Sequence, residues 1–399
     1  MTDWTVPDAN FTPEQVRAAR GILDRLGGTG RVDLAFLGGS LAVGLGHALS
    51  DIDLYVVGAG LPDRELSYQH DGTWVHVNPL SAGAVRDLVA LGTWYRASGL
   101  DRSQLAVDQR TLSALVRLVT GWRLHAAPEW AGRLDALNRD TVRQVLCARN
   151  ANVFSAYAED ACGALADGDR FTAATAARLA LEAACEATLA SAGDLYVGPK
   201  FLFRRLARTP VTAPWCRYLW RLAGGDTDPE TIAAVVRERL SVGSLLLSWC
   251  AVDGWDRPLD HLPAPTVPPP AAGPRRAGAY TPIRFLDGWA LIGPEDGYEV
   301  SEELVRLWRR LDGRPLSDII ATLPEAEPAL AGHGEYQIRA AVGMLADVGA
   351  VEQPGAYPIA DRDSGPYLVR NAPKFSCHPR VSRHDTGRDP APDKVGRPC

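Results

Sequence analysis

The first part of the chain alternates between helical and strand patterns of apolar positions. Apolar residues recur at helical spacing over 12–28, where Thr12 is the expected N-cap and Pro13 takes the first helical position. A short helix is expected to start near Ser40. Strands are predicted from apolar runs or alternation at 32–39, 51–57 and 73–80. This mixture of helices and strands predicts an α/β domain over residues 1–115.

Between about residues 110 and 255 the apolar positions keep a helical period, and strand patterns are absent. The helical segments, most of them rich in alanine, are 110–124, 140–165, 171–193 and 230–249. They predict a helical bundle over 116–256, packed behind the first domain. Seven prolines between 258 and 274 disfavour both helix and strand pairing, so 257–277 is expected to be a semi-rigid linker.

Regular structure is expected to return after the linker. Strand-like residues at 282–292 are followed by three helical segments, the first with Ser301 as its N-cap. Strands followed by three helices predict a small winged-helix-like domain over 278–355. Residues 356–399 are polar and rich in proline and arginine, which predicts a disordered tail. The fold class expected for the whole chain is α+β.

Composition mainly excludes partners and compartments. Hydrophobic residues make up 46% and charged residues 23% of the chain, which is ordinary for a globular protein. The net charge of −6 gives no general attraction to nucleic acid or anionic lipid, so neither DNA nor a membrane is expected as a partner. The N-terminus lacks a basic segment followed by an apolar run, and the seven cysteines are widely spaced. We therefore expect a cytoplasmic protein.

Candidate chemistry is concentrated in the stretch FLGGSLAVGLGHALSDIDLYVV. Its first strand ends in glycines, and Ser40 opens a helix whose N–H groups suit a phosphate. Asp51 and Asp53 are two positions apart on a strand, so both carboxylates are expected on one face. Two such carboxylates repel each other unless a cation lies between them. A magnesium ion carrying nucleotide phosphates is the expected cation.

Other phosphate-binding motifs do not fit this stretch. An isolated Asp-x-Asp is common and usually solvated, but the combination with Gly-Gly-Ser after a strand is much rarer. The G-x-G-x-x-G spacing of a dinucleotide fingerprint is absent, and no Gly-Lys-Ser/Thr follows to make a P-loop. The pattern favours nucleotidyl transfer.

These residues resemble the DNA polymerase β-like nucleotidyltransferase superfamily, and the α/β domain plus bundle is most similar to the aminoglycoside (kanamycin-type) nucleotidyltransferases. The resemblance covers about residues 15–250. It implies that Gly39 and Ser40 hold the β- and γ-phosphates of a nucleoside triphosphate, with ATP as the expected nucleotide. It also implies that Asp51 and Asp53 bind Mg2+.

The sequence departs from the family at the next strand, where a third carboxylate is expected and WVHVN places His76. A histidine can ligate a metal, but magnesium prefers oxygen ligands. Three interpretations remain open. His76 acts as a base or an alternative ligand, or the acid comes from elsewhere, for example Glu65 or Asp71, or the protein binds nucleotide without turnover. Asp71-Gly72 resembles a hairpin turn.

Two further residues are candidates in the bundle. In kanamycin-type enzymes a bundle carboxylate acts as general base toward the acceptor hydroxyl, and Glu159 has a suitable position, although a solvated helix face would equally explain it. Lys200 stands out because the chain has only three lysines among its 42 basic residues, and the other two lie in the tail. A lysine retained where arginine is otherwise used suggests a phosphate contact, the alternative being an ordinary lysine at a helix start.

The segment 278–355 resembles the PqqD-like fold that recognises peptides in ribosomal peptide natural-product biosynthesis. The resemblance implies that a leader peptide adds a strand beside the 282–292 edge and lies along the third helix. A DNA-binding winged helix is disfavoured, because the third helix carries one arginine and two acids in EYQIRAAVGMLADVG.

The function expected from the sequence is magnesium-dependent transfer of a nucleoside monophosphate from a triphosphate to a hydroxyl. The acceptor would be a peptide precursor of a natural product or a related small molecule. Two alternatives remain: an aminoglycoside-type small-molecule nucleotidyltransferase, and a catalytically inactive scaffold that binds nucleotide and peptide.

Overall fold

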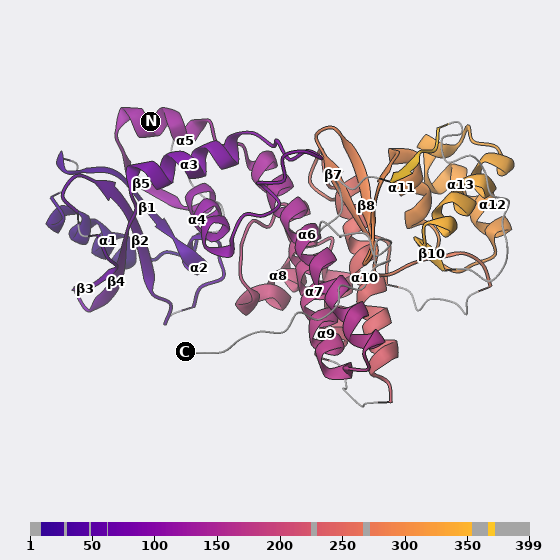
Figure 1. Ribbon diagram of the computed structural model, residues 1–399. Helices are drawn as coiled ribbons and strands as arrows, with labels where there is room; N and C mark the ends of the chain where they lie inside the picture. The colour runs from indigo at the N-terminus through magenta and orange to yellow at the C-terminus, as the bar shows by residue number, and fades with distance from the viewer. Residues whose placement is uncertain are drawn as a thin grey trace, which may run out of the picture.

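The computed structural model shows three parts in a row (Figure 1). A sheet with its helices lies at the left, a helical bundle at the centre, and a smaller domain of strands and helices at the right. The described residues are 9–27, 30–47, 49–61, 63–224, 230–265, 272–352 and 366–371. Within these ranges no helix combines the length and the apolar character needed to cross a membrane. The predicted α+β fold class is confirmed.

The first part is built on a mixed sheet, as predicted. Its strands are β1 (Val32–Gly38), β2 (Ile52–Gly58), β3 (Leu66–His70), β4 (Thr73–Pro79) and β5 (Trp122–Ala126). Their order is β3-β4-β2-β1-β5, with β2 and β4 parallel and the other neighbours antiparallel. Asp71 and Gly72 form the turn between β3 and β4, and both have positive φ, which confirms the predicted hairpin turn.

β5 lies beyond the predicted end of this domain. It follows α4 (Gln109–Thr120) and pairs with β1, so the sheet continues past residue 115 and the prediction of helix through residue 124 is wrong. A five-residue strand whose pairing partner is distant in the sequence leaves little local pattern, and the helical period of α4 dominated the prediction.

The first helix forms where its capping residues predict it. α1 (Pro13–Arg25) has Thr12 as N-cap, whose side chain accepts a hydrogen bond from the Gln15 backbone N–H. The Gln15 side chain accepts one from the Thr12 N–H in return, completing a capping box. α1 covers one face of the sheet, where Ile22 packs with Leu37 and Leu54 in a shared core.

The opposite face of the sheet is covered by helices that connect it to the bundle. α3 (Ala82–Thr93), α4 and α5 (Pro128–Asp135) pack there, and Leu34, Phe36 and Tyr55 from the strands enter the main core. Phe36 and Tyr55 stack with ring centroids 5.0 Å apart. Side chains alternate between faces along a strand, so Asp53, two residues before Tyr55, lies on this second face at the end of β2.

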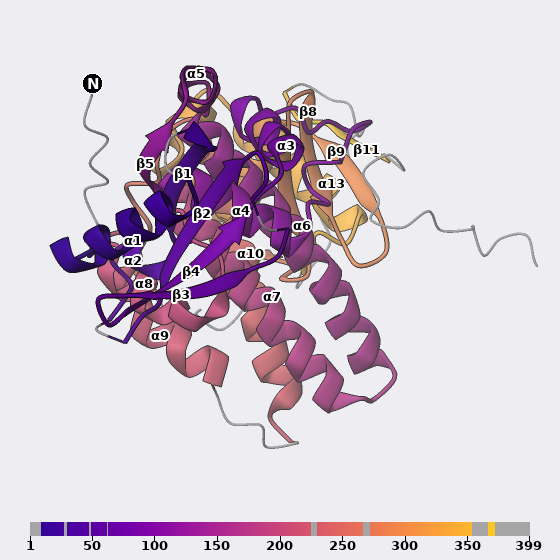
Figure 2. The ribbon, with the colours of Figure 1, turned by 90° about the vertical axis from the view of Figure 1, so that its left-hand side faces the viewer.

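Three of the four predicted helical segments form the core of the bundle: α6 (Arg139–Ala166), α7 (Arg170–Ser191) and α10 (Ile232–Val252). The buried side of α7 is largely alanine, which allows its neighbours to approach closely. Figure 2 shows α6 and α7 side by side, projecting from beneath the sheet. Three shorter elements follow α7: the 3-10 turn η2 (Pro199–Phe201), α8 (Leu202–Arg208) and α9 (Ala213–Gly224).

Part of the predicted linker packs against the bundle. Leu259 and Leu262 are buried, and the Trp215 indole N–H donates a hydrogen bond to the Pro263 carbonyl over 2.8 Å. The linker prediction is therefore wrong for 258–265, because the apolar residues there find a core that the proline pattern does not reveal. It is also wrong for 275–276, which form a strand paired with residues 351–352. Residues 266–271 lie outside the described part of the chain.

The third part contains strands followed by three helices, as predicted. The strands are β6 (Arg275–Arg276), β7 (Thr281–Phe285), β8 (Gly288–Ile292), β9 (Gly297–Val300), β10 (Val351–Glu352) and β11 (Val369–Asn371). The helices are α11 (Glu302–Arg309), α12 (Leu316–Ala326) and α13 (Glu335–Asp347), with the 3-10 turn η3 (Pro328–Leu330) between the last two. Trp308 and Leu304 of α11 are fully buried in a separate core.

β11 corrects the prediction that the chain is disordered from residue 356 onward. It pairs antiparallel with β9, and the larger sheet of this part has the order β11-β9-β8-β7. Tyr367 and Val369 are each 1% exposed, and the Tyr367 hydroxyl lies 2.7 Å from His333 Nδ1. The rest of the predicted tail, 353–365 and 372–399, lies outside the described residues.

Candidate functional site

The end of β1 and the start of β2 meet at a glycine. Gly38 of β1 pairs with Asp53 of β2, and Gly39 follows with φ +79°. A Cβ added to Gly39 would overlap the Asp53 carboxylate, so only glycine fits beside this side chain. The structure therefore brings the Gly39–Ser40 corner and Asp53 together, as the sequence predicts.

The helix that Ser40 was predicted to open is short. α2 (Gly39–Ala42) is a single turn, and the Ser40 carbonyl accepts hydrogen bonds from the Leu45 and Gly46 N–H groups. The expected positive end of a helix dipole is therefore small here. A phosphate at this corner would depend on the local backbone N–H groups and the Ser40 hydroxyl.

Two acidic side chains lie at this end of the sheet. Asp53 is half-buried, whereas Asp51 precedes β2 and is exposed. Burial raises the pKa of Asp53 above the ordinary carboxyl value. The positive charges of Arg117 and His76 act to lower this pKa, and the negative charges of Asp51 and Glu65 act to raise it. A cation bound beside Asp53 would therefore stabilise the ionised form of this partly buried carboxylate.

His76 occupies the neighbouring strand, at the position where a third acid was expected. β2 and β4 pair in parallel with Asp53 opposite His76. The imidazole Nε2 lies 3.5 Å from Asp51 Oδ1, and Nδ1 lies 2.8 Å from Ser67 Oγ of β3. The structure thus joins His76 to the acidic pair and adds Ser67, a residue that sequence reasoning missed.

The two substitute acids named from the sequence differ in position. Glu65 precedes β3 on the side of the sheet that carries Ser67, and its charge acts on both Asp53 and Tyr55. Asp71 lies in the turn at the other end of β3, with its carboxylate 3.6 Å from His70. Glu65 is therefore the acid that the fold brings toward Asp53.

These residues fit magnesium bound jointly by protein and phosphate. No group of three or more His, Cys, Asp or Glu side chains within the described ranges is arranged to hold a metal ion by itself. Magnesium commonly uses one or two carboxylates and takes its other ligands from phosphate and water. Asp51 and Asp53 supply that number of carboxylates, and the pKa of Asp53 is raised mainly because the side chain is partly buried.

Arg117 supplies positive charge that sequence reasoning did not assign to the site. Its Cβ lies 3.4 Å from where a Cβ on Gly38 would be, and its guanidinium carbon lies 5.7 Å from the centre of the Tyr55 ring. Arg117 is exposed and acts electrostatically on Asp53 and on Tyr196. Its position depends on how α4 packs on the sheet, which no local pattern indicates.

The segment containing Lys200 docks beside the Gly39–Ser40 corner. Arg204 donates to the Leu45 carbonyl over 2.8 Å, and Arg208 donates to the Val43 carbonyl over 2.7 Å. Lys200 itself is exposed, with its ammonium 5.0 Å from the centre of the Phe201 ring. Its phosphate contact stays a prediction, but the fold places it on the segment that holds the loop after Ser40.

The bundle carboxylate predicted as general base lies away from this docking region. Cys147 donates a hydrogen bond to the Ala187 carbonyl, so α6 and α7 run antiparallel with these residues side by side. In that register Glu159 lies opposite about residue 175, toward the C-terminal end of α6 and the N-terminal end of α7. The segment containing Lys200 follows the other end of α7. Glu186 lies near the Cys147 level, pairs with Arg205 over 2.7 Å, and acts electrostatically on Tyr196. Glu186 is therefore closer than Glu159 to the docked segment, whose Arg205 also pairs with Asp194.

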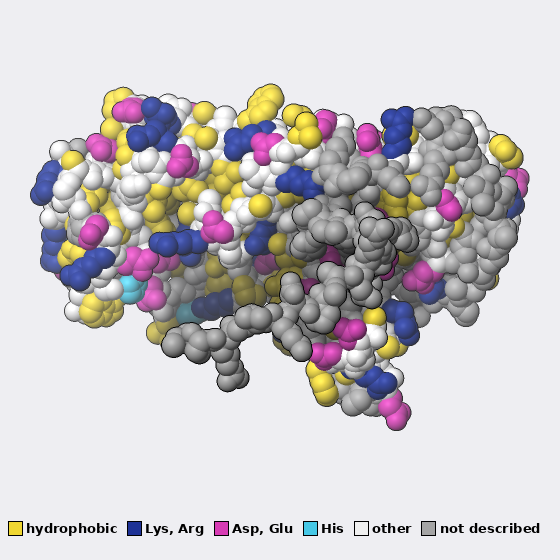
Figure 3. Space-filling model, viewed as in Figure 1, with side chains coloured by type: hydrophobic (Ala, Val, Ile, Leu, Met, Phe, Trp, Pro, Cys, Tyr) yellow, Lys and Arg dark blue, Asp and Glu magenta, His cyan; other side chains and the backbone are white. Residues whose placement is uncertain are grey.

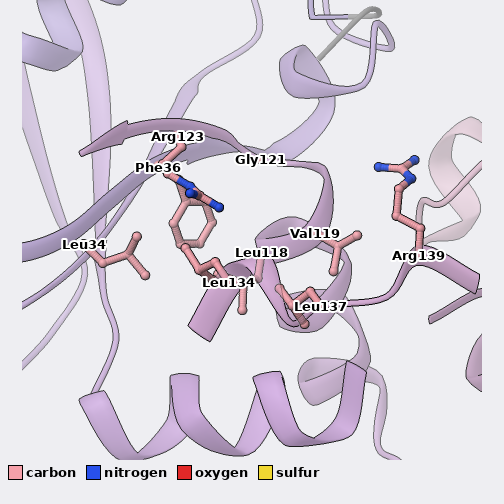
Figure 4. Close-up of a pocket in the computed structure, with 9 residues that line it drawn as sticks. All are labelled: Leu34, Phe36, Leu118, Val119, Gly121, Arg123, Leu134, Leu137 and Arg139. Atoms are coloured by element: carbon pink, nitrogen blue, oxygen red, sulfur yellow. The ribbon is translucent and has the colours of Figure 1, made fainter. Parts of the chain in front are cut away.

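Neither of two cavities in the described part of the chain includes Gly39, Ser40 or Asp53. The cavity in Figure 4, about 30 Å³, lies between the sheet and α4 and α5, with Phe36, Leu118 and Leu134 in its wall and Arg123 beside it. It has room for about one water molecule. A larger cavity of about 540 Å³ is lined by residues of 249–263 and 306–328, none from the first sheet. The nucleotide candidate is therefore the open surface at Asp53.

Charged side chains of both signs lie over the first sheet. On the face shown in Figure 3, acidic side chains and histidine lie together over the lower part of this region, with arginine or lysine side chains beside them. Acidic groups for a cation next to basic groups for an anion suit a metal–phosphate ligand.

Comparison with known proteins adds little to this geometry. No protein-family model matches the chain, and no curated protein matches it in sequence. Among solved structures, it is similar to a nucleotidyltransferase-like protein from Exiguobacterium sibiricum 255-15, with 12% identity and a TM-score of 0.32. The match covers 60% of this chain and 80% of that one. Superposition at this level is too poor to assign a fold or an activity, so the function rests on the side chains of the site.

Proposed function

We propose that the protein is a magnesium-dependent nucleotidyltransferase that moves a nucleoside monophosphate from ATP, or another triphosphate, to a hydroxyl. The observation that carries the proposal is the contact between the Asp53 carboxylate and Gly39, with Asp51 and Arg117 beside them. This arrangement provides one triphosphate with carboxylate ligands for its metal ion, a backbone that it can approach closely, and a positively charged side chain.

Each group has a distinct role in this proposal. The β- and γ-phosphates lie at the Gly39–Ser40 corner, and Asp51 and Asp53 hold Mg2+. A bound magnesium ion would neutralise the phosphate charge and favour the departure of pyrophosphate. Arg117 binds phosphate oxygens from the α4 side, and Lys200 approaches from the docked segment.

His76 is the proposed base for the acceptor hydroxyl. Ser67 Oγ lies 2.8 Å from Nδ1 and Asp51 Oδ1 lies 3.5 Å from Nε2, so the imidazole ring is held from both sides, as general base catalysis requires of a positioned side chain. If Glu65 supplies this function instead, replacing His76 spares activity and replacing Glu65 abolishes it. A protein that binds nucleotide without transfer is the remaining alternative.

The acceptor proposed is a peptide precursor or a related small molecule, and the third part of the chain is the proposed peptide-recognition element. The edge predicted for this peptide, at 282–292, is already used. The Tyr95 hydroxyl donates to the Arg284 carbonyl over 2.9 Å, and the Leu286 N–H donates to the Ala97 carbonyl over 2.8 Å. β8 lies between β7 and β9, so it offers no free edge.

The opposite edge of the same sheet is the alternative docking strand. β9 pairs there with β11 of the same chain, which shows that the edge accepts an extended segment with buried residues at alternate positions. A peptide acceptor would replace β11. α13 remains a poor DNA-recognition helix, because its Arg339 pairs with Glu335 at 2.7 Å.

The test is binding and turnover of α-labelled ATP with magnesium. Asp51→Asn and Asp53→Asn are each expected to abolish magnesium-dependent binding and pyrophosphate release. Asp71→Asn is the matched control, because Asp71 is an exposed acid on the same sheet and asparagine tolerates its φ of 47°. Unchanged ATP binding in Asp53→Asn would refute the proposal.

A further inference from the structure

Ser67, His76 and Asp51 form a line of polar contacts at the first sheet, and the proposed function gives Ser67 only a positioning role in it. Ser67 Oγ lies 2.8 Å from His76 Nδ1, and His76 Nε2 lies 3.5 Å from Asp51 Oδ1. A hydroxyl hydrogen-bonded to an imidazole that is oriented by a carboxylate is the arrangement of an activated nucleophile. Ser67 is exposed, so an electrophile in solution or on the sheet can reach it.

The strand register places this hydroxyl in line with the nucleotide candidate. Gly38 pairs with Asp53, Asp53 with His76, and His76 with Ser67. These four residues form one row across neighbouring strands, which lie about 4.8 Å apart. A triphosphate bound at the Gly39–Ser40 corner and Asp53 therefore has His76 and then Ser67 as its next neighbours along the row.

We propose that Ser67 is itself an acceptor, so that the protein attaches a nucleoside monophosphate to its own Ser67. This inference rests on the proposed function, because it uses the same triphosphate site. Ser67 Oγ attacks the α-phosphorus, and a new oxygen–phosphorus bond forms. The bond from the α-phosphorus to the bridging oxygen breaks, pyrophosphate leaves with its electron pair, and the Ser67 proton passes to His76 Nδ1. The product is a phosphodiester on Ser67.

The geometry also predicts how the reaction depends on protein concentration. Asp53, His76 and Ser67 belong to one sheet, so donor site and acceptor lie in the same molecule. The modification is therefore first order in protein, with a rate constant independent of protein concentration. A reaction between molecules would become faster on concentration.

The experiment measures the intact mass of the full chain after incubation with ATP and magnesium chloride, followed by peptide mapping. One adenosine monophosphate is expected on the peptide containing Ser67. Ser67→Ala is expected to lose the adduct while keeping ATP affinity, measured by fluorescence anisotropy of a labelled analogue. Gln69→Ala is the control, because Gln69 is exposed on the same face of β3 and is expected to retain the adduct.

The outcomes separate this inference from the proposed function. If ATP binds and pyrophosphate is released but Ser67 stays unmodified, Ser67 only positions His76, and the inference alone is overturned. An adduct that persists in Ser67→Ala also overturns it. If the native protein binds no triphosphate, both the inference and the proposed function fail.

Discussion

The Asp53 carboxylate lies against the α-carbon of Gly39, in the space that any other side chain at position 39 would need. This contact joins the end of β1 to the start of β2 and brings the carboxylate proposed to bind magnesium next to the backbone corner proposed to bind phosphate. The proposed function depends on it more than on any other pair of residues.

Gly39→Ala is expected to abolish ATP binding as well as reduce stability. The φ of +79° at Gly39 costs a non-glycine residue about 1–2 kcal/mol, and the added methyl group would also displace Asp53. Gly72→Ala is a close control, since Gly72 has the same φ of +79° and nothing within 4 Å of an added Cβ. Urea unfolding should show a loss for both variants, whereas calorimetric titration with ATP should show lost binding only for Gly39→Ala. Equal ATP affinity in the two variants would contradict the role of this contact.

Asp53→Asn is expected to raise stability while removing function. Burial raises the pKa of Asp53 in the folded state, so ionising it costs more there than in the unfolded chain. Stability is therefore lost as pH rises from the ordinary carboxyl pKa through the raised one, and the asparagine variant escapes this loss. With EDTA present, the variant should have the higher Tm at pH 7, and the difference should shrink below the ordinary carboxyl pKa. A lower Tm at pH 7 would show that Asp53 stabilises the fold instead.

Arg117→Ala is expected to weaken ATP binding about tenfold, which corresponds to about 1.4 kcal/mol. The guanidinium faces Asp53 and Tyr55 and is available to phosphate oxygens. Arg110→Ala, on the same helix and also exposed, serves as the control and should bind ATP normally. Raising the salt concentration should weaken binding by native protein more than by Arg117→Ala. Identical ATP affinities of Arg117→Ala and Arg110→Ala would show that Arg117 does not contribute to ATP binding.

Removing β11 is expected to open the β9 edge to peptides. A chain ending at residue 365 loses the buried Tyr367 and Val369 and should be less stable by about 3 kcal/mol than one ending at residue 371. The matched pair differs only in the segment that contains β11. Candidate precursor peptides should bind the shorter chain more tightly in anisotropy titrations. Equal or weaker binding by the shorter chain would mean that β9 is not the docking strand.

Local sequence patterns predicted the helices and strands where chemistry and periodicity agree. Thr12 and Pro13 fixed the start of α1, and the turn residues Asp71 and Gly72 fixed the β3–β4 hairpin. The patterns failed at β5 and β11, which are three to five residues long and exist because a partner strand is present. The linker prediction failed at 258–265 for the same reason, because Leu259 is buried only where the bundle provides a core.

The sequence by itself determined that a glycine-serine corner would follow one strand and that two acids would lie at or near the start of another, because strand periodicity and glycine's freedom at positive φ are local properties. Only the tertiary structure decided which other side chains join them. Arg117 arrives on a packed helix, Ser67 arrives through strand register, and Glu159 is carried away by the pairing of α6 with α7. Contacts between distant segments depend on how cores fill and strands align, and these are properties of the whole fold.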